Sequence, residues 1–272
     1  MTNLTTHYEN IFLNKQKNIT YNTSFYDELL KPENIPSLND FLLSTGNIKI
    51  FDNFTTEECR YILSKGITAD IKNKRGQNIW FNIKSAAVAK VFYEYNRDID
   101  MSDERGNVPV KHARAEMLNF FISKGVNLNY VNKKGCNLLW FSHDKETEIL
   151  LKHGLNVNHT NKSGESCLFM KPVHLMHVSD IREFYYLSKA KANILIKKNI
   201  DINIKDINNK NALIGLTEPD SDIIKTLIEN GIEYEGYSLP EKLQDFIVNL
   251  EKKKLQASTV IKNDKKAEPK RL

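Results

Sequence analysis

A pattern of polar and hydrophobic positions recurs through the middle of the chain. Each copy has a Gly or Asn, a short alternation of apolar and polar residues, a second Gly or Asn, and an apolar cluster. Copies begin 30, 29, 29 and 45 residues apart, and a truncated copy begins at Gly231. The two Gly or Asn positions are ten residues apart in every full copy: Gly66–Gly76, Asn96–Gly106, Gly125–Gly135, Gly154–Gly164 and Asn199–Asn209. We interpret this segment as an array of about five repeats.

Each copy predicts a finger-like loop between helices. The first Gly or Asn suits the left-handed residue that ends a helix, and the second suits a turn before the next helix. A helix over Lys145–His153 places Ile149, Leu150 and Leu151 largely on one side. Such a helix cannot bury its apolar face alone, so neighbouring repeats must stack. We expect Leu139 and Leu168 in the resulting core.

These residues resemble the ankyrin repeat, whose signature is roughly D-x-x-G-x-T-P-L-H followed by two helices ending L-L-x-x-G-A-D-V-N. That ending is clearest in Ile149–Asn158, ILLKHGLNVN. The resemblance implies an all-α solenoid of helix-turn-helix units with short finger loops, between a non-repeat N-terminal cap and a C-terminal helical cap. The TPLH positions correspond to Asn78–Phe81, Val108–Lys111, Asn137–Trp140, Ser166–Phe169 and Asn211–Ile214.

Two features depart from the family pattern. The period is shorter than the usual 33 residues, so we expect the first helix of each repeat, or the turn after it, to be trimmed. Phe81, Trp140 and Phe169 replace the His that normally bonds between repeats. The indole N–H groups of Trp80 and Trp140, both expected in the core, need hydrogen-bond partners.

We expect four regions in the chain. Residues 1–54 form an N-terminal capping region, 55–236 the solenoid with an insertion at about 170–190, 237–256 a C-terminal capping helix, and 257–272 a disordered basic tail. Thr55 and Glu58 are spaced as a capping box, and Asp180 and Glu183 predict the start of a helix over 181–198. Pro240 lies in the first turn of the last helix. The insertion is either an exposed spacer or a projection that touches a partner.

Composition narrows the class of protein. The net charge is +5, but residues 252–272 carry eight basic and two acidic side chains, or +6, which leaves the remaining chain near −1. Nucleic-acid-binding folds usually carry the basic charge on the folded body, so nucleic acid is not an expected partner. Three widely spaced cysteines suit a reducing compartment. With no apolar span or secretory signal in the sequence, we expect a cytoplasmic protein.

No sequence motif predicts catalysis. The chain has no GxSxG, GxxxxGK[ST], HExxH or GxGxxG motif. His174 and His177 could share a helix face, but no acidic or Cys side chain has metal-ligand spacing to them. Cys167 is interpreted as a small core residue rather than a nucleophile. We therefore expect a non-enzyme with no cofactor and no metal.

The fingers are the expected binding surface. Stacked fingers form an extended concave edge, and because most are basic, an acidic partner surface is favoured. We expect the partner to be centred on the third and fourth repeats. Solvent-facing finger positions also include Lys72, Asp103, Lys205 and Asp206. The residues expected to bind the partner are Lys74, Arg75, Glu104, Arg105, Tyr130, Lys133, Lys134, His143, His159 and Lys162.

Three functions remain open from the sequence. The leading hypothesis is a stoichiometric inhibitor, such as a bacterial or phage immunity protein that blocks a partner, acting as a monomer or in a 1:1 complex. The second is a host-directed adaptor that recruits a target, for example to a ubiquitin ligase. The third is nucleic-acid binding through the basic tail and fingers, for which steep salt dependence is the expected signature.

Overall fold

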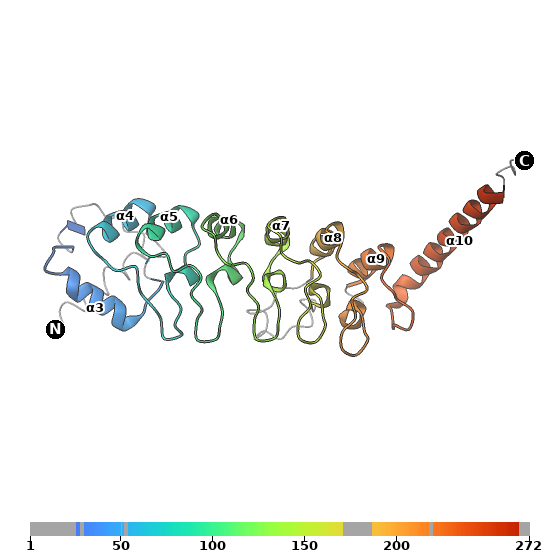
Figure 1. Cartoon of the computed structure of the whole chain (residues 1–272), viewed down its shortest axis with the longest axis horizontal. Helices are drawn as coiled ribbons and strands as arrows, with labels where there is room; N and C mark the ends of the chain where they lie inside the picture. Colours follow the sequence, from blue (N-terminus) through green and yellow to red (C-terminus); the bar gives the residue numbers. More distant parts are fainter. Residues whose placement is uncertain are drawn as a thin grey trace, which may run out of the picture. The chain divides into compact units, whose positions relative to one another are not determined.

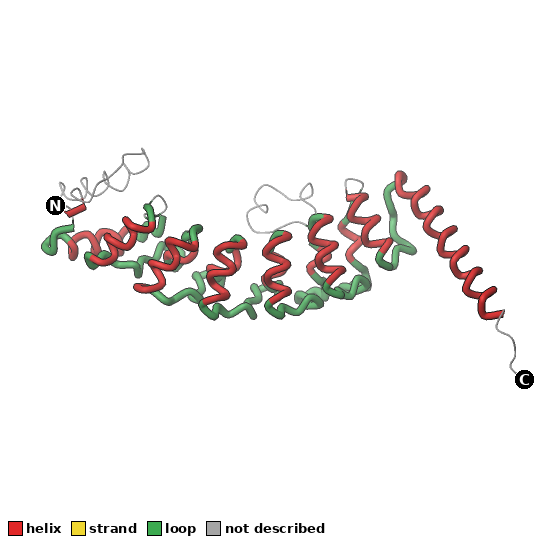
Figure 2. The backbone as a smooth tube through the Cα atoms, turned by 90° about the horizontal axis from the view of Figure 1, so that it is seen from above, coloured by secondary structure: helices red, strands yellow, loops and turns green. Residues whose placement is uncertain are grey.

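The computed structural model (Figure 1) describes residues 26–27, 30–49, 51, 54–170, 187–217 and 220–266, with side chains described as far as residue 256. The chain divides into two compact units, Met1–Asn156 and Val157–Leu272. Their described parts consist of helices and loops (Figure 2), and β pairing there is limited to isolated bridges such as Lys72 with Asn78. None of the helices in those parts is long and apolar enough to cross a membrane.

The first unit is a row of α-helices joined by loops and short 3₁₀ turns. Its helices are α3 (Ile35–Thr45), α4 (Thr56–Ser64), α5 (Ala86–Tyr95), α6 (Ala115–Ser123) and α7 (Asp144–Lys152). A 3₁₀ turn precedes each of the last three: η2 (Ile79–Phe81), η3 (Pro109–His112) and η4 (Leu138–Phe141). Helices α4 to α7 pack in chain order, and the finger loops lie on the opposite side of the unit (Figure 1).

The second unit continues the same alternation. Its elements are η5 (Cys167–Phe169), α8 (Lys189–Lys197), η7 (Ala212–Gly215), α9 (Ser221–Glu229), η9 (Glu241–Leu243) and α10 (Gln244–Lys266). Helix α8 packs against α9, and η5 against η7. Each repeat therefore pairs one short 3₁₀ turn with one full α-helix.

The expected trimming of the first helix is confirmed. Each of these helices is a single 3₁₀ turn of three or four residues. In most repeats a polar residue just before the turn caps it: the Asn137 side chain accepts the Leu139 N–H at 3.1 Å, and Asn211 accepts that of Leu213 at 3.1 Å. Such side-chain bonds satisfy N–H groups that a helix start leaves unpaired. A short period is thus accommodated without exposing the core.

Helix starts agree with the sequence in one case and differ in another. The capping box is confirmed, because the Glu58 N–H donates to Thr55 Oγ1 at 3.2 Å and the Thr55 N–H donates to Glu58 Oε2 at 2.7 Å. The unbroken helix expected over 181–198 is wrong, because α8 begins only at Lys189. The Ser188 side chain accepts the Lys191 N–H at 2.9 Å and caps the helix there. The expected start at Asp180 lies outside the described residues.

Helix ends follow the sequence pattern with one exception. Gly66, Gly125, Gly154, Asn199 and Gly231 have positive φ, as expected. The left-handed conformation expected for Asn96 is wrong, because its φ is −139°. The Asn96 side chain instead accepts the indole N–H of Trp80 at 3.1 Å and donates to the Ala69 carbonyl at 3.3 Å. Asn96 therefore has an extended backbone and uses its side chain to link Trp80 to Ala69.

The core contains the apolar positions that the alignment of the repeats predicted. Leu139 and Leu168 are each 1% exposed, which confirms the prediction. Trp80 stacks on Phe120 with ring centroids 5.9 Å apart. Trp140 is also buried, but its indole N–H has no hydrogen-bond partner among the described residues, so the partner expected for it is not found.

Further elements lie at the two ends of the array. Asn39 of α3 donates to the Gly66 carbonyl at 3.0 Å and accepts the Thr68 N–H at 2.8 Å, which ties α3 to the first repeat. In the second unit, Leu243 at the end of η9 and Ile247 in the first turn of α10 are buried. Helix α10 runs to Lys266, so ten residues expected in a disordered tail are helical. The residues after Gln256 lack Gly and Pro as far as Pro269, so neither of the strongest helix-breaking residues interrupts this stretch.

Candidate functional site

Five turns of identical design form the ends of the fingers. In turn 1, residues 73–76, Asn73 Oδ1 accepts the N–H groups of Arg75 at 2.8 Å and Gln77 at 3.1 Å, and the Gly76 N–H donates to the Asn73 carbonyl at 2.9 Å. The same three bonds recur in turn 2 (103–106), turn 3 (132–135), turn 4 (161–164) and turn 5 (206–209). Turns 1 to 3 belong to the first unit and turns 4 and 5 to the second.

The second Gly or Asn of each copy closes one of these turns. All five have positive φ, from 59° at Asn209 to 84° at Gly135, so the predicted equivalence is confirmed. The sequence interpretation missed the residue three positions earlier. This first residue of the turn can be recognised in the sequence, because it is Asn or Asp in every copy: Asn73, Asp103, Asn132, Asn161 and Asp206. A short side chain of this kind bonds to backbone two residues on and fixes the turn.

The two central positions of each turn are exposed, except that Ser163 in turn 4 is half-buried. They hold seven of the ten residues expected to bind a partner, all of which are exposed: Lys74, Arg75, Glu104, Arg105, Lys133, Lys134 and Lys162. Tyr130 and His159 each lie two residues before a turn and are half-buried. His143 is not in a finger, because it directly precedes α7 and its carbonyl accepts the Thr147 N–H at 2.8 Å. His159 and Lys162 lie in the second unit, and the other eight lie in the first.

Asp103 corrects one expectation. It was predicted to face solvent but is 5% exposed. Its carboxylate accepts from the side chain of Gln77 at 2.9 Å and from the backbone and side chain of Asn107. Burial by itself would raise the pKa of Asp103, but the N–H groups of Asn107, Gln77 and Arg105 outweigh burial and hold that pKa below its ordinary value. Asp103 thus joins turns 1 and 2.

This buried network continues into the third repeat. The Lys111 ammonium donates to Asn107 Oδ1 at 2.8 Å and lies 4.3 Å from the centre of the Phe141 ring. Lys111 occupies the position of the family's bonding His. Tyr130 packs edge-on against Phe141, with ring centroids 6.4 Å apart. Burial first, and then the Asp103 charge, raise the pKa of Tyr130 to about 12, so its phenol is neutral at physiological pH.

Neighbouring turns touch in two places. The Glu104 N–H donates to the Arg75 carbonyl at 3.0 Å, which joins turn 2 to turn 1. The equivalent bond joins turn 5 to turn 4, from the Ile207 N–H to the Ser163 carbonyl at 2.9 Å. Gly106 has nothing within 4 Å of where a Cβ would stand, so the tip of turn 2 is open on that side. The structure thus brings Lys74, Arg75, Glu104 and Arg105 together.

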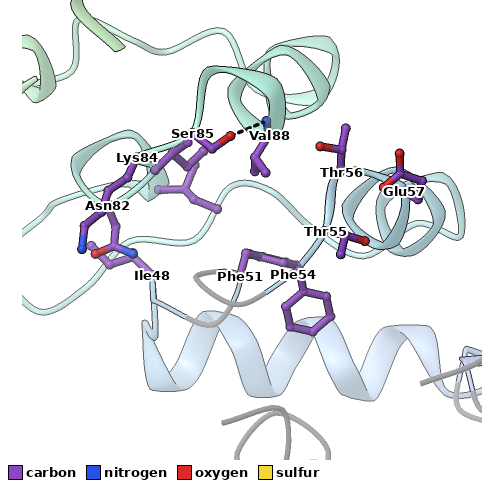
Figure 3. A pocket seen from close by; sticks show the side chains of 12 residues that line it. Ile48, Phe51, Phe54, Thr55, Thr56, Glu57, Asn82, Lys84, Ser85 and Val88 are labelled. Carbon is purple, nitrogen blue, oxygen red and sulfur yellow. Dashed lines mark hydrogen bonds between the residues drawn. The ribbon is translucent and has the colours of Figure 1, made fainter. Parts of the chain in front are cut away.

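Two cavities flank the first repeat. One of about 490 Å³, here named the turn 1 pocket, is lined by Thr45, Ile48, Lys49, Asn73, Lys74, Arg75, Gln77, Phe81, Asn82 and His112. The other, of about 510 Å³, lies by the N-terminal ends of α4 and α5 (Figure 3). Phe51, Phe54 and Val88 give it apolar walls, and Ser85 caps α5 at its rim. Lys49 and His112 could not be predicted as neighbours of turn 1, because the cavity combines residues from the cap and two repeats.

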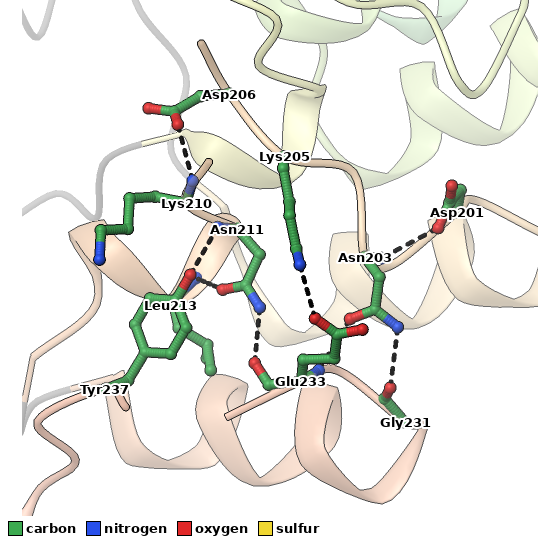
Figure 4. Close-up of polar contacts among 10 residues, drawn as sticks. All are labelled: Asp201, Asn203, Lys205, Asp206, Lys210, Asn211, Leu213, Gly231, Glu233 and Tyr237. Atoms are coloured by element: carbon green, nitrogen blue, oxygen red, sulfur yellow. Dashed lines mark hydrogen bonds and ion pairs between the residues drawn. The ribbon is translucent and has the colours of Figure 1, made fainter. Parts of the chain in front are cut away.

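Turn 5 is held by the truncated repeat (Figure 4). Lys205 forms an ion pair with Glu233 at 2.8 Å, and the bond to Glu233 raises the pKa of Lys205. Asn203 bridges the backbone of Gly231 and Glu233, and the Asn211 N–H donates to Tyr237 Oη at 2.7 Å. Lys205 is exposed, as predicted, but its charge is already paired.

The remaining candidates for chemistry are the cysteines and the histidine pair. Cys59, Cys136 and Cys167 are buried and form no disulfide, which agrees with a core role for Cys167. Burial raises the pKa of the Cys167 thiol to about 11, against a smaller lowering by the Lys191 charge. No three His, Cys, Asp or Glu side chains in this part of the chain gather as a metal site. His174 and His177 lie outside the described residues.

Comparison with known proteins identifies the fold. No family model matches the sequence, and no curated protein matches it. Among solved structures, the chain is similar to the ankyrin repeat domain of Bcl-3, with a TM-score of 0.51, 15% identity, and coverage of 74% of this chain and 96% of that one. It is also similar to an ankyrin repeat domain of Acinetobacter baumannii AYE, with a TM-score of 0.50, 20% identity, and coverage of 65% and 93%. The chain therefore has the ankyrin-repeat fold, with a short repeat period.

Proposed function

We propose that this chain is a non-catalytic protein-binding module that acts as a stoichiometric inhibitor of the immunity type, holding its partner against the finger turns. The observation that carries the proposal is the repeated presentation of unpaired cations on fixed turns. Lys74, Arg75 and Lys133 are exposed and make no ion pair with any described residue. Each turn is fixed by three internal hydrogen bonds, so little conformational entropy is lost when a partner binds.

A basic and aromatic edge favours an acidic protein surface. Charges of one sign on a binding edge accelerate encounter with an opposite charge and select the partner. Tyr130 adds a neutral aromatic side chain beside turn 3, and aromatic residues are enriched at interface centres. A stable complex buries about 1,200–2,000 Å² in total, which exceeds what one turn offers, so several turns must contribute.

The test is capture of the partner from the native cell, followed by measurement of stoichiometry and affinity. We expect one partner at 1:1. The variant Lys133→Glu with Lys162→Glu should stay folded, because both side chains are exposed, and should bind at least about tenfold more weakly. The matched control is Lys90→Glu with Lys145→Glu, which makes the same charge change on exposed positions of α5 and α7.

Several outcomes would reject this function. If the control variant loses affinity and the turn variant does not, the partner binds the α-helix side. Capture of a ubiquitin-ligase subunit together with a second protein would favour the adaptor. Salt-sensitive binding of DNA or RNA without a protein partner would favour a nucleic-acid role.

A further inference from the structure

The charged side chains that line the turn 1 pocket are all basic. Lys49 comes from the segment after α3, Lys74 and Arg75 from the centre of turn 1, and His112 from the end of η3. No Asp or Glu lines this cavity of about 490 Å³. Two acidic residues lie next to the lining: the Asp103 carboxylate accepts from the Gln77 side chain, and the Glu104 N–H donates to the Arg75 carbonyl. Three full positive charges therefore converge on one cavity.

These charges are not neutralised by the protein. Lys49, Lys74 and Arg75 form no ion pair and no side-chain hydrogen bond with any described residue. The described ion pairs of the first unit, Arg60–Glu94 and Lys65–Asp27, involve none of the three. Like charges held close together repel one another, and a bound anion relieves that repulsion.

The wall that carries the cations is held on both sides. Gly46, with φ of +58°, lies so close to turn 1 that a Cβ there would come within 2.5 Å of the Lys72 carbonyl oxygen. On the other side, the Glu104 N–H holds the Arg75 carbonyl at 3.0 Å. Turn 1 thus packs against Gly46 of the cap on one side and is hydrogen-bonded to turn 2 on the other. The cavity is thus preformed, and preformed sites lose less entropy on binding.

We propose that the turn 1 pocket binds a short acidic segment of the partner protein, with its carboxylates paired to Lys49, Lys74 and Arg75 and an apolar side chain against Phe81. This inference rests on the proposed function and names the part of the partner that the first repeat recognises. A polyanion such as DNA needs a wide basic track. The chain before residue 252 has a net charge near −1, and the acidic residue Glu104 lies next to turn 1, so the basic residues of the pocket are not part of a uniformly basic face.

The test is fluorescence anisotropy of the full chain with labelled probes at low salt. The probe is a fluorescein-labelled decapeptide rich in Glu and Asp, beside its Gln and Asn counterpart and a single-stranded decanucleotide. We expect the acidic peptide to bind, the neutral peptide not to bind, and affinity to fall as salt rises. Lys74→Glu with Arg75→Glu should weaken binding by about tenfold or more, while Lys90→Glu with Lys145→Glu should change it less than twofold.

The outcomes separate this inference from the proposed function. Absence of peptide binding, equal losses in the two double variants, or tighter binding of the decanucleotide would each overturn it. Another outcome is that the captured partner binds the Lys74→Glu with Arg75→Glu variant normally but fails to bind the Lys133→Glu with Lys162→Glu variant. In that case the partner does not use the pocket, and the protein-binding function stands. If the acidic peptide binds the pocket but no native partner engages the turns, the proposed function fails by itself.

Discussion

Replacing Asp103 with Ala should destabilise the first unit more than any other single change in a turn. The carboxylate is buried and accepts from the Arg105 and Asn107 N–H groups at 2.9 and 2.8 Å. It also accepts from the side chains of Gln77 and Asn107. The substitution leaves these donors without an acceptor and unties turn 1 from turn 2.

The magnitude follows from the number and kind of these bonds. A hydrogen bond to a charged group contributes about 1.5–3 kcal/mol, and a bond whose donor can turn to water contributes less. The bonds from Arg105, Gln77 and Asn107 are all partly buried. We therefore expect a loss of about 3 kcal/mol in the free energy of unfolding. Asp103→Asn should lose less, because its remaining oxygen can still accept the backbone N–H groups.

The assay is urea denaturation followed by circular dichroism, with Asp206→Ala as the matched control. Asp206 makes the same backbone bonds in turn 5 at 2.9 Å, but no neighbouring turn donates to its side chain. Its midpoint should shift clearly less than that of Asp103→Ala. Equal shifts in the two variants, or a loss below about 0.5 kcal/mol for Asp103→Ala, would refute the bridging role.

The pH dependence supplies a second check on Asp103. Because its pKa is lower in the folded state than in the unfolded state, its carboxylate stabilises the fold fully above the unfolded pKa, about 3.9. That stabilisation is lost as pH falls through the lowered folded pKa. The stability difference between the natural chain and Asp103→Asn should therefore be constant above about pH 5 and shrink below about pH 4. A constant difference down to pH 2 would contradict this assignment.

Three further predictions concern the core, the turns and Tyr130. Leu139→Ala and Leu168→Ala should each cost roughly 2–5 kcal/mol in chemical denaturation, because both side chains are 1% exposed. Gly164→Ala should lower the melting temperature more than Gly106→Ala, because a Cβ at Gly164 meets turn 5 at 3.3 Å whereas Gly106 faces open space. In ultraviolet titration, the difference between the natural chain and Tyr130→Phe should show a phenol that ionises near pH 12; ionisation near pH 10 would contradict its burial.

The sequence predicted the repeat and its turns because both depend on local chemistry. Positive φ at Gly76 or Gly164 requires glycine or asparagine, so the ten-residue spacing is visible in one chain. The apolar register of Leu139 and Leu168 is equally local. The reduction of the first helix to one 3₁₀ turn could be inferred only through the short period.

Features that join distant residues could not be predicted. Gln77, Asp103 and Lys111 lie in two different repeats, and nothing in their spacing indicates that they share one network. Aspartate is a residue type that is usual in exposed turns, yet the neighbouring amide groups that donate to Asp103 make its burial favourable. Lys49 belongs to the cap, outside the repeat pattern, and reaches the turn 1 pocket only through the fold.

Hydrogen–deuterium exchange of the full chain with and without the captured partner tests the central claim most directly. The backbone N–H groups of Lys74, Lys133 and Lys162 donate no hydrogen bond to any described residue, so they should exchange rapidly in the free protein. If the partner is held against the finger turns, exchange in the segments around these residues should slow on binding, while exchange in α5 and α7 stays unchanged. Slowing confined to the α-helices, with unchanged turns, would contradict the account.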